Sequence, residues 1–137
     1  MYLIDTVVLS ELRKRERHAG IVQWLRGRAV DTLFLSVITI GEIERGVLRQ
    51  RARNPACAEA LGAWLDRTVE AYLDRILAVD TRIARRWGQL SARIGHGGAD
   101  LLIAATALEH GLTVVTRNVR HFLPTGVPVE DPFQDPN

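Results

Sequence analysis

The feature that most constrains the fold of this chain is the alternation of short apolar runs with longer segments of helical periodicity. Five runs have the length and composition of buried strands, at residues 2–4, 33–37, 76–79, 112–115 and 127–129. The segments between them place apolar residues at helical spacing, as in Ile40, Ile43 and Val47. This alternation predicts an α/β fold with helices layered around a mostly parallel sheet, in which Pro128 marks the last strand as an edge strand.

The length and composition restrict the class of protein further. A chain of 137 residues with 47% hydrophobic residues fits a single domain, residues 1–137, with a polar tail at 131–137 that we expect to fray. Cys57 is the single cysteine, which excludes an internal disulfide and a thiolate metal cluster. The sequence has no signal-peptide pattern and no apolar run of bilayer length, so we expect a cytoplasmic protein that does not enter a membrane.

Acidic residues stand where predicted strands end and helices begin. Asp5 follows the first strand, Glu42 falls in the expected first turn of the helix after the second, and Asp100 opens the helix after a glycine-rich loop. Asn118 follows the fourth strand. Strand ends and the helix starts that follow them share one edge of a parallel sheet, so we expect the three acids to meet at one rim.

Three gathered carboxylates repel one another and require a cation or raised pKa values. Because neither cysteine nor a suitably spaced histidine pair accompanies them, oxygen ligation favours Mg²⁺, with Mn²⁺ as an alternative. Such an ion readies a water molecule for attack on a phosphodiester.

Each acid also has a structural interpretation, and spacing alone leaves the choice open. Asp5 fits the N-cap of the helix that follows it, as Asp80 does after the third strand. Glu42 and Thr39 fit a capping box, and Asp100 complements a helix dipole.

Four segments, in order along the chain, resemble the motifs of the PIN-domain family, in particular its VapC toxins. They are Leu3–Leu12, Leu35–Ile43 with Arg45 and Gly46, Ala99–Ala107, and Leu112–Val119 with Phe122. The resemblance implies an α/β/α sandwich, a divalent-metal site and endonucleolytic cleavage of RNA. It also implies a homodimer and a VapB-like antitoxin partner.

The same resemblance assigns roles to residues and exposes two departures. Asp5, Glu42 and Asp100 match the metal-site acids. Val7 stands where the family usually has asparagine, and Asn118 and His121 are the candidates where the family has a fourth acid. Asn118 still offers a carbonyl oxygen and completes the predicted catalytic set. We therefore expect strong dependence on one ion and weaker, or more Mn²⁺-dependent, cleavage.

Other residues have two interpretations each. The hydroxyls of Thr6 and Thr116 either hold metal-bound water or cap strand ends. His121 either acts at the site, as a weak ligand or a phosphate donor, or is a surface residue beside Phe122. A basic run after the first helix fits RNA backbone contacts or a solvated helix end: Arg13, Lys14, Arg15 and Arg17.

The sequence thus predicts a divalent-metal-dependent endoribonuclease, the toxin of a VapBC-type pair. The alternative is a catalytically weakened PIN-like module that binds RNA or antitoxin. A phospho-receiver-like domain also gathers acids at strand ends, but it needs a lysine at the fifth strand, and the only lysine is Lys14.

Overall fold

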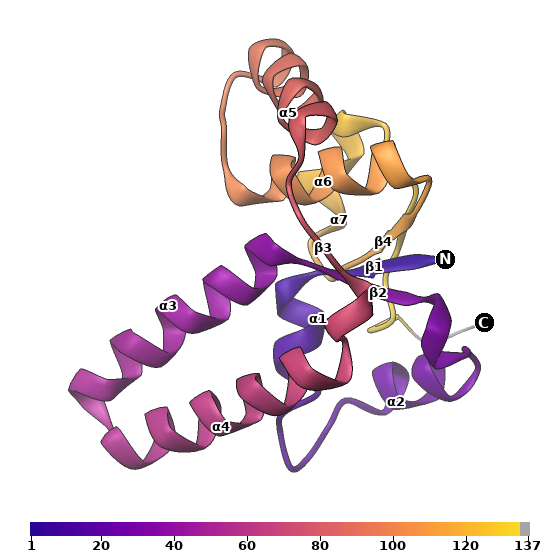
Figure 1. Ribbon diagram of the computed structural model, residues 1–137. Helices are drawn as coiled ribbons and strands as arrows, with labels where there is room; N and C mark the ends of the chain where they lie inside the picture. Colours follow the sequence, from indigo (N-terminus) through magenta and orange to yellow (C-terminus); the bar gives the residue numbers. More distant parts are fainter. Residues whose placement is uncertain (135–137) are drawn as a thin grey trace.

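The five apolar runs form one five-stranded sheet in the computed structural model, which describes residues 1–134 (Figure 1). The strands are β1 (Tyr2–Ile4), β2 (Leu33–Ser36), β3 (Ile76–Leu77), β4 (Thr113–Val115) and β5 (Val129–Glu130). Their order is β3-β2-β1-β4-β5, and every neighbouring pair is parallel. The last strand lies at an edge, as Pro128 predicted.

Helices cover both faces of this sheet, which confirms the three-layer sandwich. They are α1 (Thr6–Glu11), α2 (Ala19–Arg26), α3 (Val37–Arg53), α4 (Pro55–Ala71), α5 (Thr81–Ile94), α6 (Ala99–His110) and α7 (Val119–Phe122). In Figure 1, α5, α6 and α7 lie on one side of the strands and α1 to α4 on the other.

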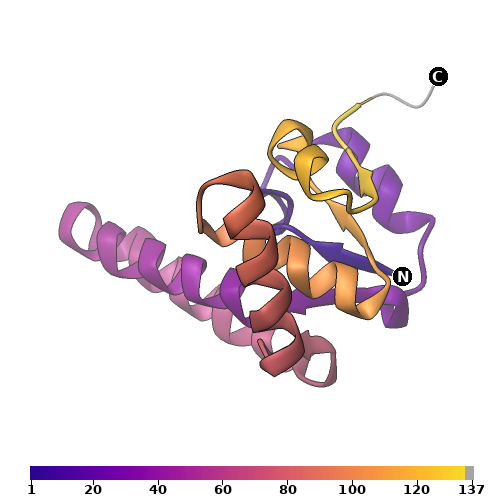
Figure 2. The ribbon, with the colours of Figure 1, turned by 90° about the horizontal axis from the view of Figure 1, so that it is seen from above.

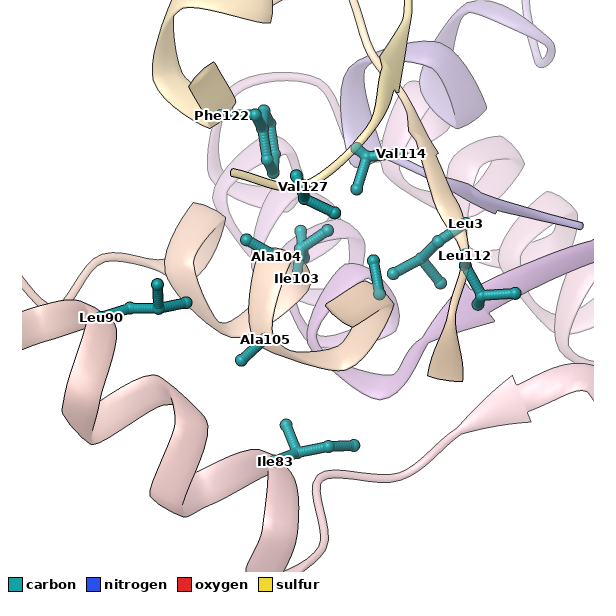
Figure 3. Close-up of a cluster of buried hydrophobic side chains, with 11 residues drawn as sticks. Leu3, Ile83, Leu90, Ile103, Ala104, Ala105, Leu112, Val114, Phe122 and Val127 are labelled. Atoms are coloured by element: carbon teal, nitrogen blue, oxygen red, sulfur yellow. The ribbon is translucent and has the colours of Figure 1, made fainter. Parts of the chain in front are cut away.

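The two-residue period of the strands builds a separate core on each face. Leu3 and Val114 point toward α5, α6 and α7, where they pack with Ile103 and the fully buried Phe122 (Figure 3). Their neighbours, such as Ile4, point to the opposite face and pack with α1 to α4. The sheet is therefore buried on both sides, and its polar chemistry is confined to the ends of the strands.

Local capping decides where the helices begin. Asp80 caps α5 as predicted, accepting a hydrogen bond from the Ile83 amide at 2.9 Å. Ser36 caps α3 by accepting from the Ile38 amide at 3.0 Å, so the helix starts at Val37. The predicted position of Glu42 in the first turn and the predicted Thr39 capping box are therefore wrong.

Helices α3 and α4 form a long antiparallel hairpin that extends away from the sheet (Figures 1 and 2). Asn54 separates them and caps α4 through the Cys57 amide at 3.2 Å. The tail predicted to fray is described only in part. Pro132 is buried and Phe133 packs 4.3 Å from the Arg117 guanidinium, while residues 135–137 lie outside the described residues. No helix within residues 1–134 has the length and apolarity needed to span a bilayer.

Candidate active site

Asp5 stands at the end of β1, at the N-cap of α1, and only 2% of its surface is exposed. Its Oδ1 accepts a hydrogen bond from the Thr6 amide at 2.8 Å, and its Oδ2 accepts from Thr116 Oγ1 at 2.8 Å. Its own amide donates to the Val115 carbonyl at 2.9 Å, across the β1–β4 pair. Asp5 is thus both the predicted helix cap and a carboxylate fixed at the rim.

The surroundings of Asp5 raise its pKa to about 6. Burial is the largest cause, and the hydrogen bonds from Thr116 and Thr6 oppose it. The negative charges of Asp100 and Glu42 raise the pKa further. The charges of two predicted acids therefore reach the third, although the three come from separate segments of the chain.

Glu42 lies on α3 and is held by the first residue of α1. Its Oε1 accepts from Thr6 Oγ1 at 2.7 Å, and Thr6 Oγ1 lies 3.2 Å from the hydroxyl of the buried Thr39. Thr6 therefore links two acids, through its amide to Asp5 and through its hydroxyl to Glu42. Our sequence prediction gives Thr39 no role at the site. The feature that could have indicated such a role is a polar residue between apolar neighbours.

Asp100 is the second residue of α6, in its first turn as predicted. Its Oδ2 lies 2.9 Å from His121 Nδ1, and the two side chains are 32% and 62% exposed. The buried Phe122 anchors the short helix α7 in the core beside His121. His121 is thus a surface histidine that also contacts a site acid.

Asn118 occupies the N-cap position of α7. Its amide donates to Thr116 Oγ1 at 2.9 Å, and Thr116 in turn donates to Asp5. Within residues 1–134 the Asn118 side chain forms no hydrogen bond, and the residue lines a separate hollow together with His121 and Arg120. Thr116 therefore caps the end of β4, which is one of its two predicted interpretations, and both threonines also donate to site carboxylates, which the sequence did not predict.

The predicted RNA-binding run is exposed and only partly adjoins the acids. Arg13 lines the same cavity as Thr6 and Glu42. Lys14 pairs with Glu11 at 2.7 Å on its own turn of chain. In the described part of the chain, no ion pair or hydrogen bond joins Arg15 or Arg17 to the acids. Val7, the first departure from the family pattern, is 39% exposed.

The three acids have the ligand chemistry of a hard-cation site, but their side chains, as they lie, do not surround one ion. All three acids offer only oxygen, which suits Mg²⁺ or Mn²⁺. As the side chains lie, no group of three aspartate, glutamate, histidine or cysteine side chains among residues 1–134 is placed to hold one ion. Thr6 donates a hydrogen bond to Glu42, and His121 contacts Asp100. Asp5 is buried, and the charges of the other two acids raise its pKa.

Comparison with known proteins assigns the chain to a family. A family model of the PIN domain matches residues 2–123. VapC ribonuclease Y4jK of Sinorhizobium fredii is 31% identical over 141 residues, covering 98% of this chain and 99% of that protein.

Solved structures agree with the sequence comparison. The crystal structure of FitAcB from Neisseria gonorrhoeae superposes with a TM-score of 0.84 at 32% identity, covering 97% of this chain and 99% of that one. A toxin–antitoxin complex from Klebsiella pneumoniae gives a TM-score of 0.72 at 26% identity, with 98% and 100% covered. Because the family model spans most of the chain and the fold agrees throughout, this chain belongs to the PIN-domain family.

Proposed function

We propose that this protein is a divalent-metal-dependent endoribonuclease and the toxin of a VapBC-type toxin–antitoxin pair. The observation that carries the proposal is the position of the buried Asp5 at the carboxyl end of the sheet, where Thr6 joins it to Glu42 and the charges of Glu42 and Asp100 both reach it. The name of the Sinorhizobium relative, a VapC ribonuclease, supports RNA as the substrate.

Asp5, Glu42 and Asp100 are the residues that would hold the ion. When bound, Mg²⁺ or Mn²⁺ supplies Lewis acidity toward a phosphate oxygen and lowers the pKa of water. The protein supplies orientation: Thr116 and the Thr6 amide fix both oxygens of Asp5, and Thr6 Oγ1 sets Glu42. Asn118 holds Thr116 through its backbone amide, and Thr116 in turn donates to Asp5.

The direct test is cleavage of single-stranded RNA by purified protein, with Mg²⁺, with Mn²⁺ and with EDTA. We expect cleavage that requires the ion and that Asp5→Asn abolishes, together with its growth toxicity. Asn preserves the acceptor for the Thr6 amide, so the variant removes charge and keeps the helix cap. Cleavage or toxicity at the wild-type level in Asp5→Asn contradicts the proposal.

The partners proposed are a VapB-like antitoxin and a second copy of the chain, with the cytoplasm as the place of action. The Klebsiella structure, a toxin–antitoxin complex, supports the antitoxin. If a small reading frame adjoins the gene, its co-expression should yield a complex, and light scattering should give the mass of a dimer. A monomeric toxin that ignores the co-expressed partner contradicts both assignments.

The alternative, a non-catalytic module that binds RNA or antitoxin, is favoured by two observations. Within residues 1–134 the acids are not placed to hold one ion as they lie, and Asn118 stands where the family pattern has an acid. This alternative predicts no heat of Mn²⁺ binding and no RNA cleavage, with the antitoxin still bound.

A further inference from the structure

A groove lies between α1 and the α3–α4 hairpin and has a volume of about 520 Å³. Its lining is half polar and half apolar: Thr6, Ser10, Arg13, Glu42, Ile43, Gly46, Gln50, Cys57 and Leu61. We call it the hairpin groove. Its volume falls in the range of small-molecule sites, large enough for the base and sugar of a nucleotide.

The hairpin groove opens from the acid site. Thr6 and Glu42 belong to both, since Thr6 donates to the Glu42 carboxylate at 2.7 Å and both line the groove. From Glu42 to Gln50 the groove follows α3 for eight residues, about 12 Å at the rise of an α-helix. A polymer positioned over the acids therefore has a direct continuation along this helix.

Polar side chains in the groove have spare hydrogen-bonding capacity. Within residues 1–134, no protein group hydrogen-bonds to the side chains of Ser10, Arg13 or Gln50. The Gln50 amide offers both a donor and an acceptor, which suits the edge of a base, and a guanidinium such as that of Arg13 binds phosphate or stacks on a base. Ile43 and Leu61 supply an apolar surface between them.

Gly46 keeps part of the groove open. It lies inside α3, where glycine costs about 1 kcal/mol of helix stability relative to alanine. A Cβ at this position would meet no atom within 4 Å, so protein packing does not require the glycine. A larger side chain here would project into the space that the groove leaves free.

We propose that the hairpin groove binds the single-stranded RNA segment next to the cleaved phosphate and that Gln50 distinguishes its base. This rests on the proposed nuclease function, and it adds the residues that select the cleavage sequence. Continuity with the acids, the Arg13 cation and the unpaired amide favour an RNA strand over a protein segment. Single-stranded RNA is read in this manner, by stacking and by hydrogen bonds to unpaired base edges.

The single cysteine of the chain allows RNA binding in the groove to be measured without any RNA cleavage. Cys57 is exposed and lines the groove, so a bound strand should shield it from alkylation. We would measure the rate of reaction with N-ethylmaleimide in Asp5→Asn protein, with the tetranucleotides of A, C, G and U in turn. Protection should reach about tenfold when the RNA is at ten times its dissociation constant.

Three substitutions in the same background sharpen the test. Gly46→Leu should remove the protection by filling the groove. Gln50→Leu should leave protection but equalise the four tetranucleotides, because it loses the amide and keeps the size. Gly41→Leu is the matched control: it lies on α3, is exposed and outside the groove, and its Cβ also meets nothing within 4 Å. It should behave as its Asp5→Asn parent does.

The outcomes separate the groove from the nuclease. RNA that fails to protect Cys57, or that protects it equally in Gly46→Leu, overturns the groove proposal, even if wild-type protein cleaves RNA. Protection by the co-expressed antitoxin alone also overturns it, since the groove is then a protein site. Base-dependent protection that Gly46→Leu removes supports the groove, even if wild-type protein cleaves nothing and the nuclease proposal fails.

Discussion

The two walls of the acid site use the same side-chain chemistry in opposite ways. On one wall, Asp5 is buried, with one oxygen bound by Thr116 and the other by the Thr6 amide. On the other wall, Asp100 is one-third exposed, and within residues 1–134 its side chain has one hydrogen-bond partner, the still more exposed His121. Asp5 is thus fixed at both oxygens, whereas Asp100 is contacted at one oxygen by an exposed side chain.

This difference indicates that the two carboxylates have different roles in the site. The Asp5 wall carries an electrostatic cost, because burial and two neighbouring acids raise the pKa of Asp5 to about 6. A cation relieves that cost. Among the described residues, one hydrogen bond constrains the Asp100 carboxylate, so we expect this wall to adjust if an ion or a phosphate binds.

The largest expected effect is on the stability of the metal-free protein. The pKa of Asp5 is raised in the folded state from 3.8 to about 6, so the folded protein binds more protons and loses stability as pH rises through this window. Asp5→Asn should therefore be more stable than wild type by about 2–3 kcal/mol above pH 6.5, with the difference vanishing near pH 4.

Urea unfolding in EDTA across this pH range measures the difference. Asp100→Asn, on the exposed wall, is the comparison and should change stability by less than about 0.5 kcal/mol. If the two variants change the free energy of unfolding equally at neutral pH, the two walls do not differ in the way described.

The second prediction concerns the threonine behind Asp5. Thr116→Val keeps the shape but removes the hydroxyl that donates to Asp5 and accepts from the Asn118 amide. Cleavage should fall by about 10–100-fold, as when a group supporting a metal ligand is lost. RNA-cleavage kinetics, with circular dichroism as the folding control, test this; a change under twofold means that Asp5 needs no support.

The third prediction concerns the wall that carries Asp100. His121→Ala should lower cleavage by less than about tenfold, because its partner Asp100 is exposed and such contacts are individually weak. His121→Gln, which keeps a polar side chain, should recover part of the loss. A loss larger than that of Thr116→Val, measured in the same assay, reverses the ranking of the walls.

The smallest effect is a gain. Asn118→Asp restores an acid at a position whose side chain forms no hydrogen bond within the described chain, so it should raise cleavage in Mg²⁺ severalfold, about 2–10-fold. The ratio of Mg²⁺ to Mn²⁺ activity should rise with it. Equal activity of Asn118→Asp and wild type in Mg²⁺ means that the missing acid is of no consequence.

Much of this architecture follows from local pattern. The apolar runs predicted the strands, and Pro128 predicted the edge, because strand burial and backbone restriction are properties of short segments. Asp5, Asp80 and Asp100 lie at their predicted places for the same reason, since each directly follows a strand or opens a helix.

Where the prediction fails, the cause is a competing local signal or a distant contact. The run Leu33–Val37 reads as one strand, yet the Ser36 hydroxyl starts a helix inside it, which shifts Glu42 beyond the first turn. The Thr6–Glu42 and His121–Asp100 contacts join residues 36 and 21 positions apart. Neither spacing carries a local signal, so only the folded chain reveals which group holds which acid.

We propose that Asp5, Glu42 and Asp100 bind one divalent ion. The decisive experiment is calorimetric titration of the RNA-free protein with Mn²⁺, with Asp5→Asn, Glu42→Gln and Asp100→Asn as variants and Asp80→Asn, at the N-cap of α5, as the control. We expect one bound ion whose affinity falls more than about tenfold in each of the three variants and stays unchanged in the control. No binding by the wild type, or binding that survives the loss of any one of the three carboxylates, would contradict it.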